Sequence, residues 1–189
     1  MQNETISAGN GNDGVIAESN DTITLGNGID VVKAGDSETI KLNDGADTVT
    51  AGANSIITLG NGADNVTAGS DSTIKLGNGA DTVTAGANSA ITLGSGTDTV
   101  TAISSLINGG KGHDSFVFTG SFGQDTIAHF GPKHDNIVLA HAMFANFAAV
   151  QSDMTQVGAN TVITYDPADV ITLTGVKTSS LRASDFRFV

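Results

Sequence analysis

The sequence predicts an all-β protein: a right-handed parallel β-roll of 17-residue coils, followed by a β-rich C-terminal cap that contains one short helix. Three observations lead to this prediction. A glycine-rich motif recurs every 17 residues, each repeat contains two short β-branched runs, and all eight phenylalanines lie after residue 115. We expect the repeats to occupy residues 1–108, and the last glycine-rich turn and the capping region to occupy residues 109–189.

The repeat is defined by a six-residue motif that ends in aspartate. It reads LGNGID, LNDGAD, LGNGAD, LGNGAD and LGSGTD, and a shorter GNGND precedes the first copy. Within the unit at 81–97, the runs TVTA and AITL are separated by the small-residue turns AGANS and GSG. Two strands and two turns in one 17-residue unit leave no room for a helix, so each unit is interpreted as one coil of a parallel roll.

Alternation along each strand sends every second side chain toward the interior of the roll. Stacked coils then bury ladders of like residues, and no single repeat can fold alone. The three expected interior columns are Val32, Val49, Val66, Val83 and Val100; Ile23, Ile40, Ile57, Ile74 and Ile91; and Leu25, Leu42, Leu59, Leu76 and Leu93.

The composition is acidic and lacks cysteine, with 20 Asp and Glu against 8 Lys and Arg and a net charge of -12. Nucleic acids and anionic membranes require basic patches, so we expect no nucleic-acid partner and no membrane insertion. The N-terminus has neither the basic nor the apolar segment of a Sec-type signal peptide. Because disulfides are excluded, a protein that works outside the cell needs another staple, which points to a metal ion.

The aspartates that end the motif form one column: Asp13, Asp30, Asp47, Asp64, Asp81 and Asp98. Coils stack about 4.7 to 4.9 Å apart, and two carboxylates at about 5 Å repel by roughly 1 to 3 kcal/mol. The column, extended by Asp114, therefore destabilises the fold unless a cation lies between the carboxylates. Calcium suits this gap because it accepts carboxylate and carbonyl oxygens together, whereas magnesium demands octahedral geometry and keeps its waters.

Several Ca²⁺ ions are therefore expected along this edge, with glycines at positive φ turning carbonyls toward them. The segment GSFGQD at 120–125 adds one turn on the second edge. The candidate metal-binding residues are Gly11, Asp13, Gly26, Gly28, Asp30, Asn43, Gly45, Asp47, Gly60, Gly62, Asp64, Gly77, Gly79, Asp81, Gly94, Gly96, Asp98, Gly110, Gly112, Asp114 and Asp125.

The turns on the opposite edge carry a mostly neutral column: Asn20, Ser37, Asn54, Asp71 and Asn88. Asparagine is explained there by left-handed turn geometry and by amide hydrogen bonds along the stack. We therefore expect a calcium ladder on one edge only. The alternative, a metal-free solenoid whose aspartates only satisfy turn backbone, remains open.

The turns resemble the glycine-rich nonapeptides of the RTX (repeats-in-toxin) family, whose pattern is G-G-x-G-x-D-x-U-x. Residues 109–116 (GGKGHDSF) match that pattern, while the earlier copies have leucine at the first glycine and Asn43 at one second glycine. The resemblance implies a calcium-binding β-roll. In that family calcium loops lie on both edges of longer coils, so about half of the family's ligand set is missing here.

Residues 109–189 also resemble the C-terminal region of serralysin-type RTX proteins, through DTI at 125–127, DVITLTGV at 169–176 and DFRF at 185–188. The resemblance implies an uncleaved type I secretion signal, export by a type I secretion apparatus, and an extracellular or cell-surface location. Within this region we expect strands at 135–140, 160–165 and 169–176, and the short helix within 141–150.

The sequence lacks the motifs of common hydrolases, so we expect no enzyme activity. His113, His129, His134 and His141 form no H-E-x-x-H pattern, and no G-x-S-x-G elbow is present. The favoured function is a secreted calcium-binding RTX module that folds outside the cell and has a structural or export role. Two alternatives stay open: a C-terminal fragment of a larger secreted enzyme, or a solenoid face that binds ice or polysaccharide.

The ice-binding alternative depends on threonine arrays at Thr48-x-Thr50, Thr82-x-Thr84, Thr99-x-Thr101 and Thr22-x-Thr24, which resemble the surfaces of ice-binding proteins. Lys33, Lys41, Asn65 and Lys75 interrupt these arrays. Threonine is also a common exposed strand residue, so the arrays alone do not decide the function.

Overall fold

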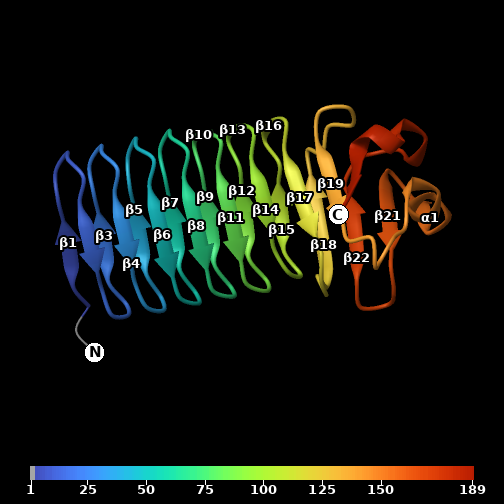
Figure 1. The fold of residues 1–189 in the computed structure, drawn as a ribbon. Helices are drawn as coiled ribbons and strands as arrows, with labels where there is room; N and C mark the ends of the chain where they lie inside the picture. Colours follow the sequence, from blue (N-terminus) through green and yellow to red (C-terminus); the bar gives the residue numbers. More distant parts are fainter. Residues whose placement is uncertain (1–2) are drawn as a thin grey trace.

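A computed structural model describes residues 3–189 and shows an all-β parallel solenoid of about eight turns (Figure 1). Two long sheets, A and B, form its two walls. Sheet A contains, in spatial order, β1 (Thr5–Ser7), β3 (Thr22–Thr24), β5 (Thr39–Lys41), β7 (Ile56–Thr58), β9 (Thr73–Lys75), β12 (Ala90–Thr92), β15 (Leu106–Asn108), β18 (Gln124–Ala128), β22 (Val170–Leu173), β21 (Asn160–Thr164) and β20 (Met154–Val157). Sheet B contains β2 (Gly14–Ile16), β4 (Val31–Lys33), β6 (Thr48–Ala51), β8 (Asn65–Ala68), β11 (Thr82–Ala85), β14 (Thr99–Thr101), β17 (Ser115–Phe118), β19 (Asn136–Leu139) and β23 (Phe186–Phe188).

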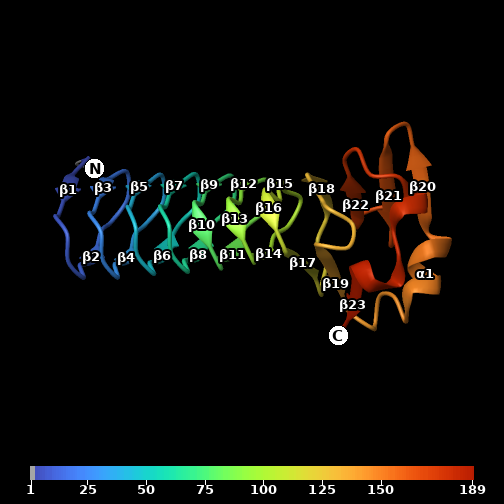
Figure 2. The same ribbon diagram turned by 90° about the horizontal axis from the view of Figure 1, so that it is seen from above.

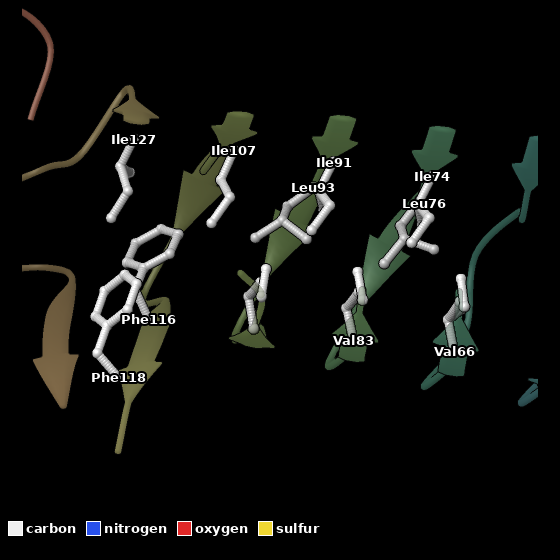
Figure 3. Close-up of a cluster of buried hydrophobic side chains, with 14 of the residues drawn as sticks. Val66, Ile74, Leu76, Val83, Ile91, Leu93, Ile107, Phe116, Phe118 and Ile127 are labelled. Carbon is white, nitrogen blue, oxygen red and sulfur yellow. The ribbon is translucent and has the colours of Figure 1, made fainter. Parts of the chain in front are cut away.

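Neighbouring coils pair in parallel and in register, so each residue lies beside its repeat equivalent. Ile23 is opposite Ile40 in sheet A, and Val83 is opposite Val100 in sheet B. The three predicted columns of valine, isoleucine and leucine are all buried, each residue being at most 4% exposed. Figure 3 shows members of the three columns, among them Val83, Ile91 and Leu93, meeting between the two sheets. The predicted core of the roll is therefore confirmed.

The sheets continue into the C-terminal region without a break. In sheet A, β18 pairs in parallel with β15 and with β22, and only then do β21 and β20 close the sheet with antiparallel pairing. In sheet B, Phe116 occupies the position of the valine column opposite Val100. Phe116 and Phe118 are fully buried beside Ile127 (Figure 3). Phenylalanine side chains thus fill the interior of the final coils.

The far end of the roll is covered by the β20–β21 hairpin and three short helical segments (Figure 2). These are α1 (Phe147–Ser152), η1 (Thr178–Ser180) and η2 (Ala183–Asp185). The three C-terminal strands that the sequence predicted are present. The helix begins later than the expected 141–150 because the Asn146 side chain caps it by accepting the N–H of Ala149.

Candidate metal-binding edge

The motif aspartates lie at the corner where each glycine-rich turn enters a strand of sheet B. Asp30, Asp47, Asp64, Asp81, Asp98 and Asp114 are each at most 2% exposed. They form one column, which we call the aspartate ladder, with Asp13 at its half-buried N-terminal end. The predicted gathering of these seven carboxyl groups on one edge is present in the structure.

From Asp30 onward, one oxygen of each carboxylate accepts a hydrogen bond from the preceding coil. The Oδ1 atom of Asp47 accepts the backbone N–H of Asp30 at 2.9 Å, and the Oδ1 atom of Asp64 accepts that of Asp47 at the same distance. The pattern repeats along the roll until Asp135 accepts the N–H of Asp114. The side chains thus satisfy backbone groups that the turns leave without a strand partner.

The other oxygen has no such role. Buried Oδ2 atoms without a hydrogen-bond partner occur, within residues 3–189, in Asp13, Asp30, Asp47, Asp64, Asp81 and Asp98. A buried ionised carboxylate with an unpaired oxygen is costly, because it has lost its water without gaining a donor. These oxygens are suited to a divalent cation, so the donor set fits the calcium that the sequence predicts.

Burial raises the pKa of several ladder carboxyl groups. Loss of hydration is the main cause and raises the pKa of Asp64 to about 6, with the charges of Asp81 and Asp47 adding to it. It raises the pKa of Asp114 to about 7, against opposing contributions from the Asp98 backbone hydrogen bond and from nearby His113. The ladder therefore needs neutralisation near neutral pH, by protons or by a metal ion.

Glycine is required at the turn positions for two different reasons. Gly28, Gly62, Gly79 and Gly96 have φ between 151° and 158°, as expected for turn glycines. The expectation of positive φ is wrong for the first glycine of each pair, at 26, 60, 77 and 94. Glycine is needed there for space, since a Cβ at Gly77 would collide with the carbonyl oxygen of Gly60 in the coil before.

Those turn carbonyls also hold the coils together. Gly26 donates its N–H to the Gly9 oxygen at 3.0 Å, and Gly60 donates to the Asn43 oxygen at 3.1 Å. Further along, three short strands form a small parallel sheet C: β10 (Asn78–Gly79), β13 (Ser95–Gly96) and β16 (Lys111–Gly112). Gly110 and Gly112, at φ 72° and 144°, form the last of these turns. A turn carbonyl that bound calcium would therefore use one lone pair for the ion and the other for its hydrogen bond to the neighbouring coil.

The opposite edge has the expected left-handed column. Asn20, Ser37, Asn54, Asp71 and Asn88 have φ between 58° and 72°. The expected amide bonding along this column is represented by the contact from Asn88 Nδ2 to Asp71 Oδ1 at 3.5 Å.

Sequence reasoning missed a second buried polar column, one residue after each of these turn positions. It contains Asp21, Glu38, Ser55, Ser72, Ser89, Ser105 and Asp125, all at most 4% exposed. Each serine hydroxyl accepts the N–H of the preceding coil; Ser72, for example, accepts that of Ser55 at 3.3 Å. The same 17-residue spacing that revealed the aspartates was the available signal for this column.

Asp125 belongs to this second column and not to the aspartate ladder. Its Oδ1 atom accepts the N–H of Ser105 at 2.7 Å, and its Oδ2 atom is buried without a partner. Burial raises its pKa to about 7, and the charge of Asp169 adds to the rise. The structure thus places the segment 120–125 on the second edge, as the sequence analysis expected.

Within residues 3–189, no group of three or more His, Asp or Glu side chains is arranged to hold a metal ion. The ladder instead offers a repeated row of single carboxylates beside backbone carbonyls. The four histidines are exposed; His113 and His134 contact each other edge to face, and the His113 Nδ1 atom lies 3.0 Å from the His134 carbonyl oxygen. No helix in the described part of the chain is long and apolar enough to cross a membrane.

Comparison with known proteins gives limited information. No family model and no curated protein sequence matches this chain. Among solved structures, the extracellular lipase LipA from Serratia marcescens is similar at a TM-score of 0.39 and 16% identity, over 99% of this chain and 38% of the lipase chain. The chain therefore spans well under half the length of that lipase, and the overall similarity is low.

Proposed function

We propose that this chain is a secreted calcium-binding β-roll module whose folding depends on calcium. The observation that carries the proposal is the row of buried, unpaired Oδ2 atoms in the aspartate ladder. A turn that needed only a hydrogen-bond acceptor would be satisfied by one oxygen, as the serines of the second column are. The second carboxylate oxygen gains a partner only if a proton or a cation binds to it.

The residues that would hold calcium are the aspartates from Asp13 to Asp114, with carbonyl oxygens of the adjoining turns. Bound calcium would supply the positive charge that neighbouring carboxylates need in order to be buried together. Its contribution to stability would follow mass action, because the unfolded chain does not hold its aspartates in a column. At low calcium the carboxylates would repel each other, so the folded state would be strongly destabilised and a large fraction of the chains would be unfolded.

This linkage suits a protein that is exported unfolded and folds where calcium is millimolar. We therefore propose an extracellular or cell-surface location, export by a type I secretion apparatus, and a structural role without catalysis. The high acidity and absence of cysteine agree with a metal-stapled extracellular module.

The test is a calcium titration of the EGTA-stripped protein, followed by far-UV circular dichroism and thermal melting. The expected result is a cooperative gain of β signal with calcium and none with magnesium at the same concentration. Counting bound calcium by mass spectrometry under native conditions then compares the number of ions with the number of ladder intervals. A stripped protein that is already folded, with a Tm unchanged by calcium, would contradict the proposal.

The outer face of sheet B supports a second candidate function, binding to an ordered surface such as ice or a polysaccharide. The register aligns Thr50, Thr67, Thr84 and Thr101 in one unbroken exposed column. The parallel column contains Thr48, Asn65, Thr82 and Thr99. Replacing Thr67 and Thr84 by lysine should abolish ice shaping under a cold-stage microscope, if the wild-type protein shapes ice, without changing calcium binding.

A further inference from the structure

A pocket of about 590 Å³ lies where the roll meets the cap. One wall is the loop after β18, with Phe130, Pro132, Lys133 and His134, and the other is the segment after β22 that extends to Arg182. Phe130 and Val176 are buried and give the pocket an apolar floor. Its volume is within the range of pockets that bind small organic ligands.

The rim of this pocket is basic, although the chain as a whole is strongly acidic. Lys133, Lys177 and Arg182 line it, which is three of the eight Lys and Arg residues in the chain. All three are exposed, and His134 lies beside them. No Asp or Glu from residues 3–189 is among the lining residues. In a chain of net charge -12, such a concentration of cations on one pocket needs an explanation.

The basic side chains are carried on fixed backbone. Lys133 has φ 79°, a conformation that is unfavourable for a side-chain-bearing residue, and its N–H donates to the Asp185 Oδ1 atom at 2.9 Å. The other oxygen of the fully buried Asp185 accepts the N–H of Arg182 at 2.8 Å. One buried carboxylate thus ties together the two segments that present Lys133 and Arg182.

The remaining wall is fixed in the same way. The carbonyl of Val176 accepts a hydrogen bond from the buried Thr161 hydroxyl at 2.9 Å, and Thr178 donates its N–H to Gln156 at 2.9 Å. Lys177 lies between these two anchored residues. Asp135, also buried, accepts the Gly131 N–H at 2.7 Å and so shapes the first loop. The rim is therefore preorganised, which lowers the entropic cost of binding a ligand.

We propose that this pocket binds a small organic oxyanion: a sulfate, phosphate or carboxylate group carried on an apolar body. The arginine fork and the two ammonium groups would take the oxyanion, since charge-assisted hydrogen bonds to such groups are strong. The apolar body would cover Phe130 and Val176. The site adjoins the end of the aspartate ladder through Asp135, but none of the ladder aspartates lines it, so calcium is not one of its ligands.

The test uses 4-nitrophenyl sulfate as the probe, because a sulfate monoester competes little for calcium, and measures its affinity for the calcium-saturated full chain by isothermal titration calorimetry. Inorganic sulfate and the neutral 4-nitroanisole separate the contributions of the oxyanion and the apolar body. The expected result is saturable binding of one 4-nitrophenyl sulfate, tighter than either half-probe. The combined variant Lys133→Gln/Lys177→Gln/Arg182→Gln should weaken it by at least about tenfold.

A matched control removes three positive charges elsewhere. Lys33→Gln/Lys75→Gln/Arg187→Gln changes exposed residues that do not line the pocket and should leave the affinity within about twofold. Both variants should keep the wild-type melting curve in calcium. Equal affinity in the two triple variants, tighter binding of 4-nitroanisole than of the sulfate ester, or no saturable binding at all would each overturn the proposal.

Discussion

In the central coils, the two edges of the roll bond the same backbone N–H groups with different side chains; towards its ends the second edge also uses acidic residues, and the Glu38 Oε1 and Asp125 Oδ2 atoms are buried there without a partner. On the glycine-rich edge Asp64 accepts the N–H of Asp47, and on the opposite edge Ser72 accepts the N–H of Ser55. Both acceptors are buried and reach back one coil. The hydroxyl completes its task with one oxygen, whereas the carboxylate leaves a second one buried and unpaired. Each aspartate therefore has one more oxygen than the hydrogen bonding of the turn requires, and we assign that second oxygen to calcium binding.

The largest expected effect comes from removing the negative charges of the aspartate ladder. In the variant Asp47→Asn/Asp64→Asn/Asp81→Asn each amide oxygen still accepts the coil-to-coil N–H, but the charge is gone. Each calcium site lost should remove about 2.7 kcal/mol of stability at a calcium concentration one hundred times its Kd. In EGTA the same variant should be more stable than wild type, because like-charge repulsion is relieved.

The measurement for this variant is urea unfolding with and without calcium. The matched control on the second edge, Ser55→Ala/Ser72→Ala/Ser89→Ala, should lose stability by the same amount in both conditions. If the aspartate variant responds to calcium as wild type does, then the ladder is not the calcium site.

The pH dependence of the calcium-free protein should be the next largest effect. The folded-state pKa is about 6 for Asp64 and about 7 for Asp114 and Asp125, above the ordinary value of 3.8. The folded state therefore holds these protons more tightly than the unfolded state. This stabilisation is complete below about pH 4 and is lost as pH rises through 6 to 7.

Thermal melts in EGTA between pH 4 and 8 should therefore show a Tm that falls as pH rises across this range. In saturating calcium the trend should reverse, since protons and calcium compete for the same carboxylates. A calcium-free Tm that rises with pH through the same interval would show that the ladder is not a set of buried carboxyl groups with raised pKa.

The stacking of the glycine-rich turns gives a third prediction. Gly77→Ala places a methyl group against the Gly60 carbonyl oxygen and should destabilise the roll by about 1 to 3 kcal/mol. Gly9 occupies the equivalent position in the first described coil, where a Cβ would meet nothing within 4 Å. Gly9→Ala should therefore leave the urea midpoint unchanged. Equal losses for the two variants would mean that the backbone conformation of the turn, not coil contact, selects glycine.

These turns also show what sequence reasoning could and could not predict. The 17-residue period located the aspartate ladder and the buried valine, isoleucine and leucine columns, because repetition converts sequence spacing directly into spatial stacking. It did not reveal that Gly77 is required by the coil before it, since that contact depends on how closely the turns approach. The basic pocket could not be predicted either, because Lys133 and Arg182 lie far apart in the sequence and come together only in the folded chain, where Asp185 bonds to the backbone of both.

The smallest expected effect is a single change on the second edge. Ser72→Ala removes one neutral acceptor and leaves the Ser55 N–H without its side-chain partner, at a cost of about 1 kcal/mol. Because no charge is removed, the loss should be the same in EGTA and in calcium, and at pH 5 and pH 8. Asp64→Asn should behave in the opposite way: it keeps the hydrogen bond between coils but changes how stability responds to calcium and to pH. If Ser72→Ala altered the calcium midpoint, calcium binding would involve both edges, and the one-edge ladder would have to be abandoned.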